Sequence, residues 1–273
     1  MKRTLYSLAM FFGMVAPCGW AAESPIAPLP RGHAHNDYEH KRPLLDALDH
    51  GFCSVEADVY LVEGRLLVAH ERDKVTPSRT LQSLYLDPLR ERANRNGGRV
   101  FRDGPVVTLL VDIKSEAEAT YAALREAFKQ YADLLCTFSS GAMEARAVLV
   151  IISGNRPRKT MEAEPLRYAA YDGRPEDLDS PVSSKFIPWI SESWGRLFKW
   201  HGVGPIPDDE KRKLQEFVSR AHAQERKVRF WGTPDQQEVW QELHDAGADL
   251  INADDLAGLQ EFLLRPSAKK PGS

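Results

Sequence analysis

Four short stretches of the chain place acid–base side chains directly after apolar, strand-like runs. They are residues 33–37 (His-Ala-His-Asn-Asp), 56–58 (Glu-Ala-Asp), 70–71 (His-Glu) and 112–114 (Asp-Ile-Lys). A run of Val, Leu and Ile that ends in carboxylates or imidazoles is poorly suited to a core. Such a pattern suits an active site, because barrel enzymes carry their reacting groups at the C-terminal ends of parallel strands.

The carboxylates of residues 52–62 fall on one face of an expected strand. Alternation places Ser54, Glu56 and Asp58 together, pointing into the barrel. Two inward carboxylates repel each other and lose hydration, which is unfavourable unless something compensates. One divalent cation, Mg2+ or Ca2+, would remove this conflict, because both ions take oxygen ligands. A hydrogen-bonded carboxylate pair at a wet strand end is the alternative.

The run 106–113 repeats this pattern, with Asp112 and Lys114 in phase on the inward face. Asp112 is therefore a candidate third cation ligand, and Lys114 a fixed positive charge for a phosphate oxygen. A simple ion pair between these two side chains is the alternative interpretation.

Imidazoles end two other expected strands. His33 and His35 share a face beside Asn36, and His70 follows the apolar run 66–69. Imidazole titrates near neutral pH, so a His on each side of a substrate can serve as base and acid. We assign these roles to His35 and His70, with His33 and Asn36 as substrate-binding candidates and His33 as the substitute for His35.

Five of the six tryptophans fall in the last third of the chain, at positions 189, 194, 200, 231 and 240. Trp231 ends a strand whose face it shares with Arg229, so we expect it to line the pocket. Trp189, Trp194 and Trp200 could form an apolar rim that touches a membrane surface or stacks on a polyol, with ordinary packing as the alternative.

Strand-like and helix-like runs alternate along the whole chain. Strands are expected at 29–33, 52–62, 106–113, 147–152, 168–171, 186–190, 228–231 and 250–252, and the main helices at 43–48, 80–96, 116–135, 208–226, 235–246 and 256–264. Alternation predicts a parallel sheet, and about eight strands predict closure into a (β/α)8 TIM barrel. Residues 173–184 lack helical periodicity, so we expect the barrel to be distorted there.

The chain begins with features of an export signal. Lys2 and Arg3 precede an apolar run with small residues near position 21, so we predict a cleavable signal peptide at 1–21. A phosphodiesterase domain at 22–265 and a disordered tail at 266–273 would follow, in a periplasmic or secreted protein. Cleavage takes the formal net charge from −3 to about −5, which argues against nucleic acid as a partner. The apolar run is too short for a secure transmembrane anchor.

Taken together, the motifs resemble the phosphatidylinositol-phospholipase-C-like phosphodiesterase superfamily. The likeness is greatest to its glycerophosphodiester phosphodiesterase branch, and within that to the altered-inheritance-of-mitochondria group. It rests on residues 35–38, 54–59, 67–71, 112–114 and 247–254. The resemblance implies a distorted barrel, one Mg2+ or Ca2+, and cleavage of a small-molecule or lipid phosphodiester by two His residues. The His-Arg-Gly and Pro-Glu-Asn-Thr elements of that branch are absent, which leaves the head group open.

Two other functions fit parts of the pattern. His33-Ala34-His35 matches the first motif of amidohydrolase-type metal enzymes, but the expected later strands contain no His to complete their ligand set. A non-catalytic barrel that binds a lipid or polyol through its tryptophans is the other alternative.

Overall fold

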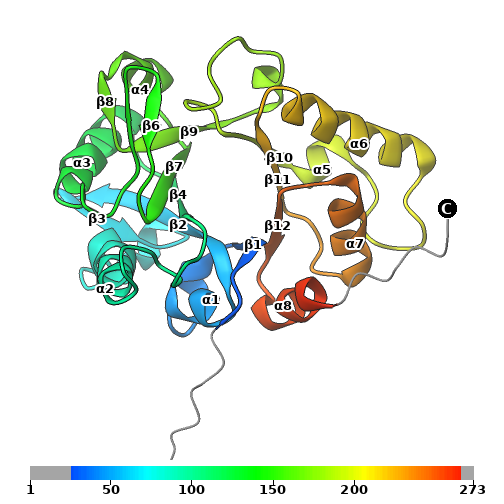
Figure 1. The fold of residues 1–273 in the computed structure, drawn as a ribbon, viewed down its shortest axis with the longest axis horizontal. Coiled ribbons are helices and arrows are strands. Elements are labelled where there is room, and N and C mark those ends of the chain that lie inside the picture. The colour runs from blue at the N-terminus through cyan, green and yellow to red at the C-terminus, as the bar shows by residue number, and fades with distance from the viewer. Residues whose placement is uncertain (1–25, 266–273) are drawn as a thin grey trace, which may run out of the picture.

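Eight parallel strands close into a barrel in the computed structural model, which describes residues 26–265 (Figure 1). β1 pairs with both β2 and β12, and this closes the ring. The strands are β1 (Leu29–Ala34), β2 (Phe52–Val62), β4 (Val107–Ile113), β7 (Val148–Gly154), β9 (Ala169–Gly173), β10 (Trp189–Ser193), β11 (Lys227–Trp231) and β12 (Leu250–Ala253). The predicted TIM barrel is confirmed. The predicted signal peptide and tail lie outside the described residues.

Helices surround this ring of strands (Figure 1). They are α1 (Leu45–Asp49), α2 (Asp87–Arg95), α3 (Ala117–Lys129), α4 (Arg158–Ala163), α5 (Trp194–Leu197), α6 (Asp208–His222), α7 (Gln237–Ala246) and α8 (Leu256–Leu264). The longer ones are amphipathic: α6 buries Leu214, Phe217, Val218 and Ala221, a three-to-four-residue spacing that presents one apolar stripe to the strands. Among residues 26–265, no helix has the length and apolar character needed to span a membrane.

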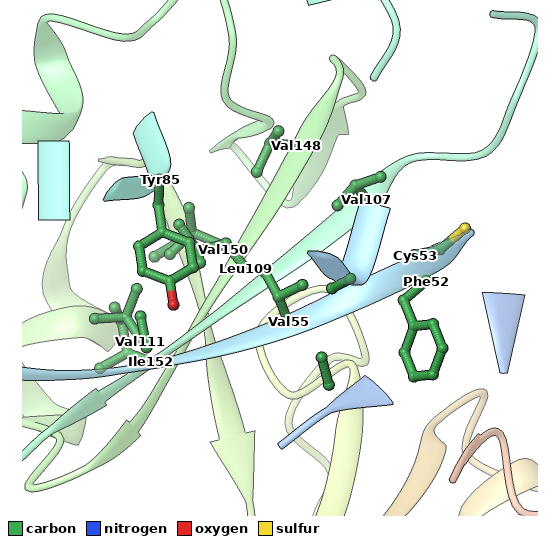
Figure 2. Packing of buried hydrophobic residues seen from close by; sticks show 14 of the residues in the cluster. Phe52, Cys53, Val55, Tyr85, Val107, Leu109, Val111, Val148, Val150 and Ile152 are labelled. Carbon is green, nitrogen blue, oxygen red and sulfur yellow. The ribbon is translucent and has the colours of Figure 1, made fainter. Parts of the chain in front are cut away.

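Apolar side chains pack on both surfaces of the barrel wall. On the outer surface, Val55, Leu109 and Val150 are in register on neighbouring strands and lie side by side (Figure 2). Inside the barrel, Leu110 and Ile151 pack with Trp189 in a separate, smaller core. This inner core fills the barrel below the polar mouth, so the acid–base side chains rest on a solid apolar floor.

The wall is irregular between β9 and β10, where the structure has a loop with one 3-10 turn instead of a helix. β9 and β10 pair at only two positions. Arg226, which is buried, donates to the carbonyl oxygens of Asp177, Leu178, Ser180 and Val182. These bonds satisfy loop carbonyls that a helix would have satisfied internally. The distortion predicted for residues 173–184 is therefore present.

Two further sets of strands lie outside the ring. β3 (Arg65–Val68) pairs antiparallel with the end of β2, as the run 66–69 suggests. A three-stranded sheet of β5 (Thr137–Ser139), β6 (Ala142–Glu144) and β8 (Leu166–Arg167) has no counterpart in the sequence-based prediction. β5 and β6 join through Ser140 and Gly141, both with positive φ. Such short strands carry too few residues to show a period.

Candidate active site

Three carboxylates from neighbouring strands meet at the mouth of the barrel. Glu56 and Asp58 lie on β2 and Asp112 on β4, and Asp58 and Asp112 are Cα partners in the parallel register. One oxygen from each of the three lies within 4.8 Å of the other two. The structure therefore brings together the three predicted cation ligands.

Each carboxylate has one oxygen bound by protein donors and one without a donor. Glu56 Oε2 lies 2.6 Å from the Arg229 guanidinium, and Lys114 Nζ lies 3.2 Å from Asp58 Oδ2 and 3.1 Å from Asp112 Oδ2. Asp58 Oδ1 and Asp112 Oδ1 are buried without a hydrogen-bond partner, and Glu56 Oε1 makes no hydrogen bond to the described residues. Unpartnered buried carboxylate oxygens are unfavourable, so this donor set fits a hard divalent cation.

Gly154 lets Asp112 take its place in this cluster. At the carboxyl end of β7, its φ is +66°, and an added Cβ would lie 2.0 Å from Asp112 Oδ1. A side chain at position 154 would therefore displace the carboxylate, and the backbone conformation is one that glycine adopts most readily.

The charges in the cluster are unevenly compensated. Burial opposes ionisation of Glu56, but Arg229 and the His33 hydrogen bond hold its pKa well below its usual range. Burial and the Glu56 charge raise the pKa of Asp58 to about 7, although Lys114 opposes this. Burial likewise raises the pKa of Asp112. A bound cation would offset this cost, because it favours both carboxylates in their charged form.

His33 does not lie where the sequence suggests. Its ring is fully buried, with Nδ1 2.7 Å from Ser54 Oγ and Nε2 3.3 Å from Glu56 Oε2. Burial and the nearby Arg229 lower its pKa to about 4, so the ring is neutral and bonds to both partners. The prediction that His33 contacts substrate or replaces His35 is wrong in this geometry, because the ring has no exposed surface. It positions Glu56 instead.

His35, just after β1, and His70, just after β3, both have partly exposed rings. His35 Nδ1 is 3.0 Å from Asp254 Oδ1, and His70 Nδ1 is 3.0 Å from the Tyr38 hydroxyl. In both rings the bonded nitrogen is Nδ1, which leaves Nε2 available for proton transfer. Asn36 Nδ2 lies 3.3 Å from His35 Nδ1.

Tyr38 is a site residue that the sequence analysis missed. Its hydroxyl lies 2.8 Å from Asp58 Oδ2 and 2.7 Å from Asn36 Oδ1, and it also contacts His70. One buried phenol thus links a carboxylate of the cluster to an imidazole. The sequence signal that could have found it is its place in the motif of residues 35–38, on which the family resemblance partly rests.

A cavity of about 540 Å³ opens beside His70. It is lined by Asn36, Tyr38, Glu39, His40, Ala69, His70, Glu71, Lys74 and Arg79. The lining is polar and carries charges of both signs, so the cavity fits a hydrophilic group better than an acyl chain.

The tryptophans differ from their prediction. Trp189, Trp194 and Trp200 are all buried, so they cannot form an exposed rim for a membrane or a polyol. Trp189 packs inside the barrel, and the Trp194 indole donates to the carbonyl of Trp200. Trp231 does lie at the mouth, at the end of β11, and the Arg174 guanidinium stacks 4.9 Å from its ring centre.

The chain is similar to known proteins in sequence and in fold. Residues 22–172 match the model of the AIM6-like phosphodiesterase domain, and residues 227–257 match that of the glycerophosphoryl diester phosphodiesterase family. Altered inheritance of mitochondria protein 6 of Eremothecium gossypii is 30% identical, and the alignment covers 87% of this chain and 70% of that protein. The protein of the same name from Saccharomyces cerevisiae strain S288c is 31% identical, with 85% and 70% covered.

Solved structures share the fold. A glycerophosphodiester phosphodiesterase from Agrobacterium tumefaciens superposes with a TM-score of 0.52 at 13% identity, over 86% of this chain and 99% of that chain. One from Parabacteroides distasonis gives 0.51 at 15% identity, over 85% and 96%. With a domain match over more than half of its length and relatives at 30% identity, the chain belongs to the AIM6-like phosphodiesterase family, within the glycerophosphodiester-phosphodiesterase-like superfamily.

Proposed function

We propose that the protein is a metal-dependent phosphoric diester hydrolase. The observation that carries this proposal is the cluster of Glu56, Asp58 and Asp112, in which one oxygen of each lies within 4.8 Å of the others, together with the partly exposed imidazoles of His35 and His70. Phosphoryl transfer needs charge stabilisation and positioned proton-transfer groups, and this site offers both. Membership of a family described as phosphodiesterases supports the same reaction class.

Glu56, Asp58 and Asp112 would hold one Mg2+ or Ca2+, which when bound supplies a positive charge for a phosphate oxygen. Lys114, with a side chain 30% exposed, adds a second positive charge beside the Asp58 carboxylate. Trp231 and Asn36 would contact the substrate. The cavity beside His70 would take the polar head group of a glycerophosphodiester or phospholipid-derived diester.

His35 and His70 would divide the proton transfers between them. Burial alone would lower the pKa of His35, but the hydrogen bond to Asp254 and the Glu56 charge raise it above its usual value. A raised pKa favours the imidazolium form, so we assign His35 as the acid that protonates the leaving oxygen. His70, held by Tyr38, then takes the proton from the attacking hydroxyl or water.

Hydrolysis of bis-p-nitrophenyl phosphate by the purified protein tests this function. We expect activity that Mg2+ or Ca2+ stimulates and a chelator abolishes. An amidohydrolase-type enzyme would instead carry zinc, which metal analysis detects. The all-carboxylate cluster and the buried His33 do not support that alternative. Absence of cation-dependent hydrolysis, with the fold intact, would favour a non-catalytic binding barrel and contradict the proposal.

Replacing Asp254 by asparagine tests the role of His35. Loss of the carboxylate should lower the pKa of His35, because a hydrogen bond that favours the imidazolium becomes weaker. An acid loses activity as pH rises through its pKa, so the alkaline limb of the kcat/KM profile should move to lower pH. A shift of the acidic limb alone would instead assign His35 as the base. The Asp254 side chain is 67% exposed, so we expect the fold to tolerate the change.

A further inference from the structure

Arg174 follows β9 directly and is held in a fixed orientation at the mouth of the barrel. Its Nη1 lies 2.6 Å from Asp172 Oδ2 and 3.0 Å from Ser191 Oγ, and its Nη2 lies 3.3 Å from Ser153 Oγ. The guanidinium also stacks on Trp231. Four neighbours from four strands therefore fix a side chain that carries a full positive charge.

The strand register places this guanidinium next to the carboxylate cluster. Ser153, which Arg174 contacts, is the Cα partner of Asp112, and Asp112 is the Cα partner of Asp58. The Nη2 edge of Arg174 is thus one strand away from the cluster, on the side away from β2. Lys114 and Arg174 follow different strands of the ring, β4 and β9.

Arg174 differs from the other buried arginine of the mouth. Arg229 is 3% exposed, and its guanidinium is bound to Glu56 and Asn252, so it cannot reach a substrate. The Arg174 side chain is 17% exposed, and its Nε makes no hydrogen bond to residues 26–265. Its Nε therefore retains donor capacity, which a purely structural partner would not need.

Asp172 serves to hold Arg174. It is fully buried, and hydroxyls of Ser153 and Ser191 donate to its two oxygens in addition to Arg174. A buried carboxylate with this many donors is a rigid anchor. Asp172 therefore fixes the orientation of the Arg174 guanidinium.

We propose that Arg174 donates hydrogen bonds to a non-bridging oxygen of the phosphodiester, across the phosphate from Lys114. This rests on the proposed function and adds a substrate-binding residue to it. Charge grows on the non-bridging oxygens during phosphoryl transfer, so a pre-oriented guanidinium stabilises the transition state more than the bound substrate. The sequence gives no hint of this role, because Arg174 lies in the loop-like segment after β9.

The test compares Arg174→Met with the double variant Asp172→Asn/Arg174→Met. The double variant removes both charges of the buried pair together, so it avoids an unpaired buried carboxylate and should fold. Arg158→Met is the matched control, because Arg158 also pairs with a buried carboxylate, Asp177, and lies 5.4 Å from the ring centre of Tyr171. Arg174→Lys keeps the positive charge but removes the planar, two-pronged set of N–H donors of the guanidinium.

Two readouts are measured: kcat/KM with bis-p-nitrophenyl phosphate, and the Kd of inorganic phosphate by calorimetry with saturating Mg2+ or Ca2+. In the double variant we expect kcat/KM to fall by about 100-fold and the phosphate Kd to rise by about tenfold or more, with cation affinity unchanged. For Arg174→Lys, both kcat/KM and the phosphate Kd should lie between the values of the double variant and the wild type. For Arg158→Met, both should match the wild type.

The result that overturns the inference is a folded double variant within about twofold of the wild type in phosphate Kd. An equal loss in Arg158→Met would also overturn it, because the effect would then be structural. If the wild type hydrolyses no phosphodiester, the proposed function fails. The phosphate titration then still tests whether Arg174 binds a phosphate group. A wild type that binds no phosphate contradicts both.

Discussion

His70→Ala and His35→Ala are each expected to lower kcat for a phosphodiester by roughly two to four orders of magnitude. Each ring has its Nδ1 bound by a neighbour, Tyr38 or Asp254, which leaves its Nε2 available for proton transfer. Without one ring, either activation of the nucleophile or protonation of the leaving oxygen must come from water. The measurement is steady-state kinetics on an alkyl phosphodiester, whose leaving oxygen requires protonation, at a saturating cation concentration.

These substitutions should leave the fold intact. The side chain of His70 is 56% exposed and that of His35 is 26% exposed, so each change removes little packing. His222→Ala is the matched control: its ring also bonds to a carboxylate, Asp249, at 2.8 Å, but on α6 and away from the mouth. Near-normal rates in both mouth variants, with His222→Ala also normal, would contradict two-imidazole catalysis.

The two His variants also separate the roles of acid and base. A substrate with an activated leaving group, such as p-nitrophenolate, needs little help from an acid. We therefore expect His35→Ala to lose less activity on bis-p-nitrophenyl phosphate than on an alkyl diester. His70→Ala should lose similar activity on both. The reverse pattern would exchange the two assignments.

The sequence predicts the core of the site because strands alternate their faces. Glu56, Asp58 and Asp112 end apolar runs and share one parity, so placing them inside a barrel requires only the strand period and the closure of the ring. Their meeting within 4.8 Å follows from adjacent strands in register. The alternation of side chains along each strand and the order of the strands in the ring are sufficient to predict this carboxylate cluster.

The residues that set the charge and orientation of the site residues cannot be predicted from the local sequence pattern. Arg229 contacts Glu56 across 173 positions of sequence, and Asp254 contacts His35 across 219. Such pairs depend on which strands become neighbours when the barrel closes, and on side-chain reach across its mouth. Tyr38 and Arg174 were missed for a related reason, because their contacts also depend on which strands become neighbours: Tyr38 meets Asp58 and His70, and Arg174 meets Ser153 and Ser191.

Of the two interpretations of the tryptophans, ordinary packing holds and the exposed rim does not, because Trp189, Trp194 and Trp200 are all buried. The apolar run 186–190 favours a strand there, but β10 extends from Trp189 to Ser193. This places Trp189 against the inner core with Leu110 and Ile151. Trp194 then starts α5 and packs on Phe198 at 4.1 Å between ring centres. Large aromatic side chains fill space that an irregular barrel leaves, and sequence spacing cannot distinguish this from a rim.

Asp112→Asn is expected to weaken cation binding by at least about 100-fold and to lower kcat/KM to a similar degree. The variant loses one of three charged ligands, and the amide is a poorer ligand for a hard cation. Calorimetric titration with Mg2+ and Ca2+ measures the affinity. Glu192→Gln is the matched control, because Glu192 is a buried carboxylate at the end of β10 outside the cluster.

Thermal stability distinguishes loss of the cation from loss of the fold. In chelator, Asp112→Asn should be at least as stable as the wild type, because burial disfavours the Asp112 charge and asparagine carries none. Added cation should raise the Tm of the wild type and leave that of the variant nearly unchanged, since a ligand stabilises only the state that binds it. A variant that still gains the full Tm increase would show that the ion binds elsewhere.

Gly154→Ala provides an independent test, since it keeps every ligand atom. Its added Cβ would crowd the Ile113 backbone as well as Asp112, so a thermal melt first establishes that the variant folds. The added Cβ would force Asp112 Oδ1 away from its position. If the cluster is a cation site, weaker cation binding should follow although no carboxylate has been removed. A site that depends on charge alone would bind the cation as before. The two variants together therefore test geometry and charge separately, and only a coordinated ion requires both.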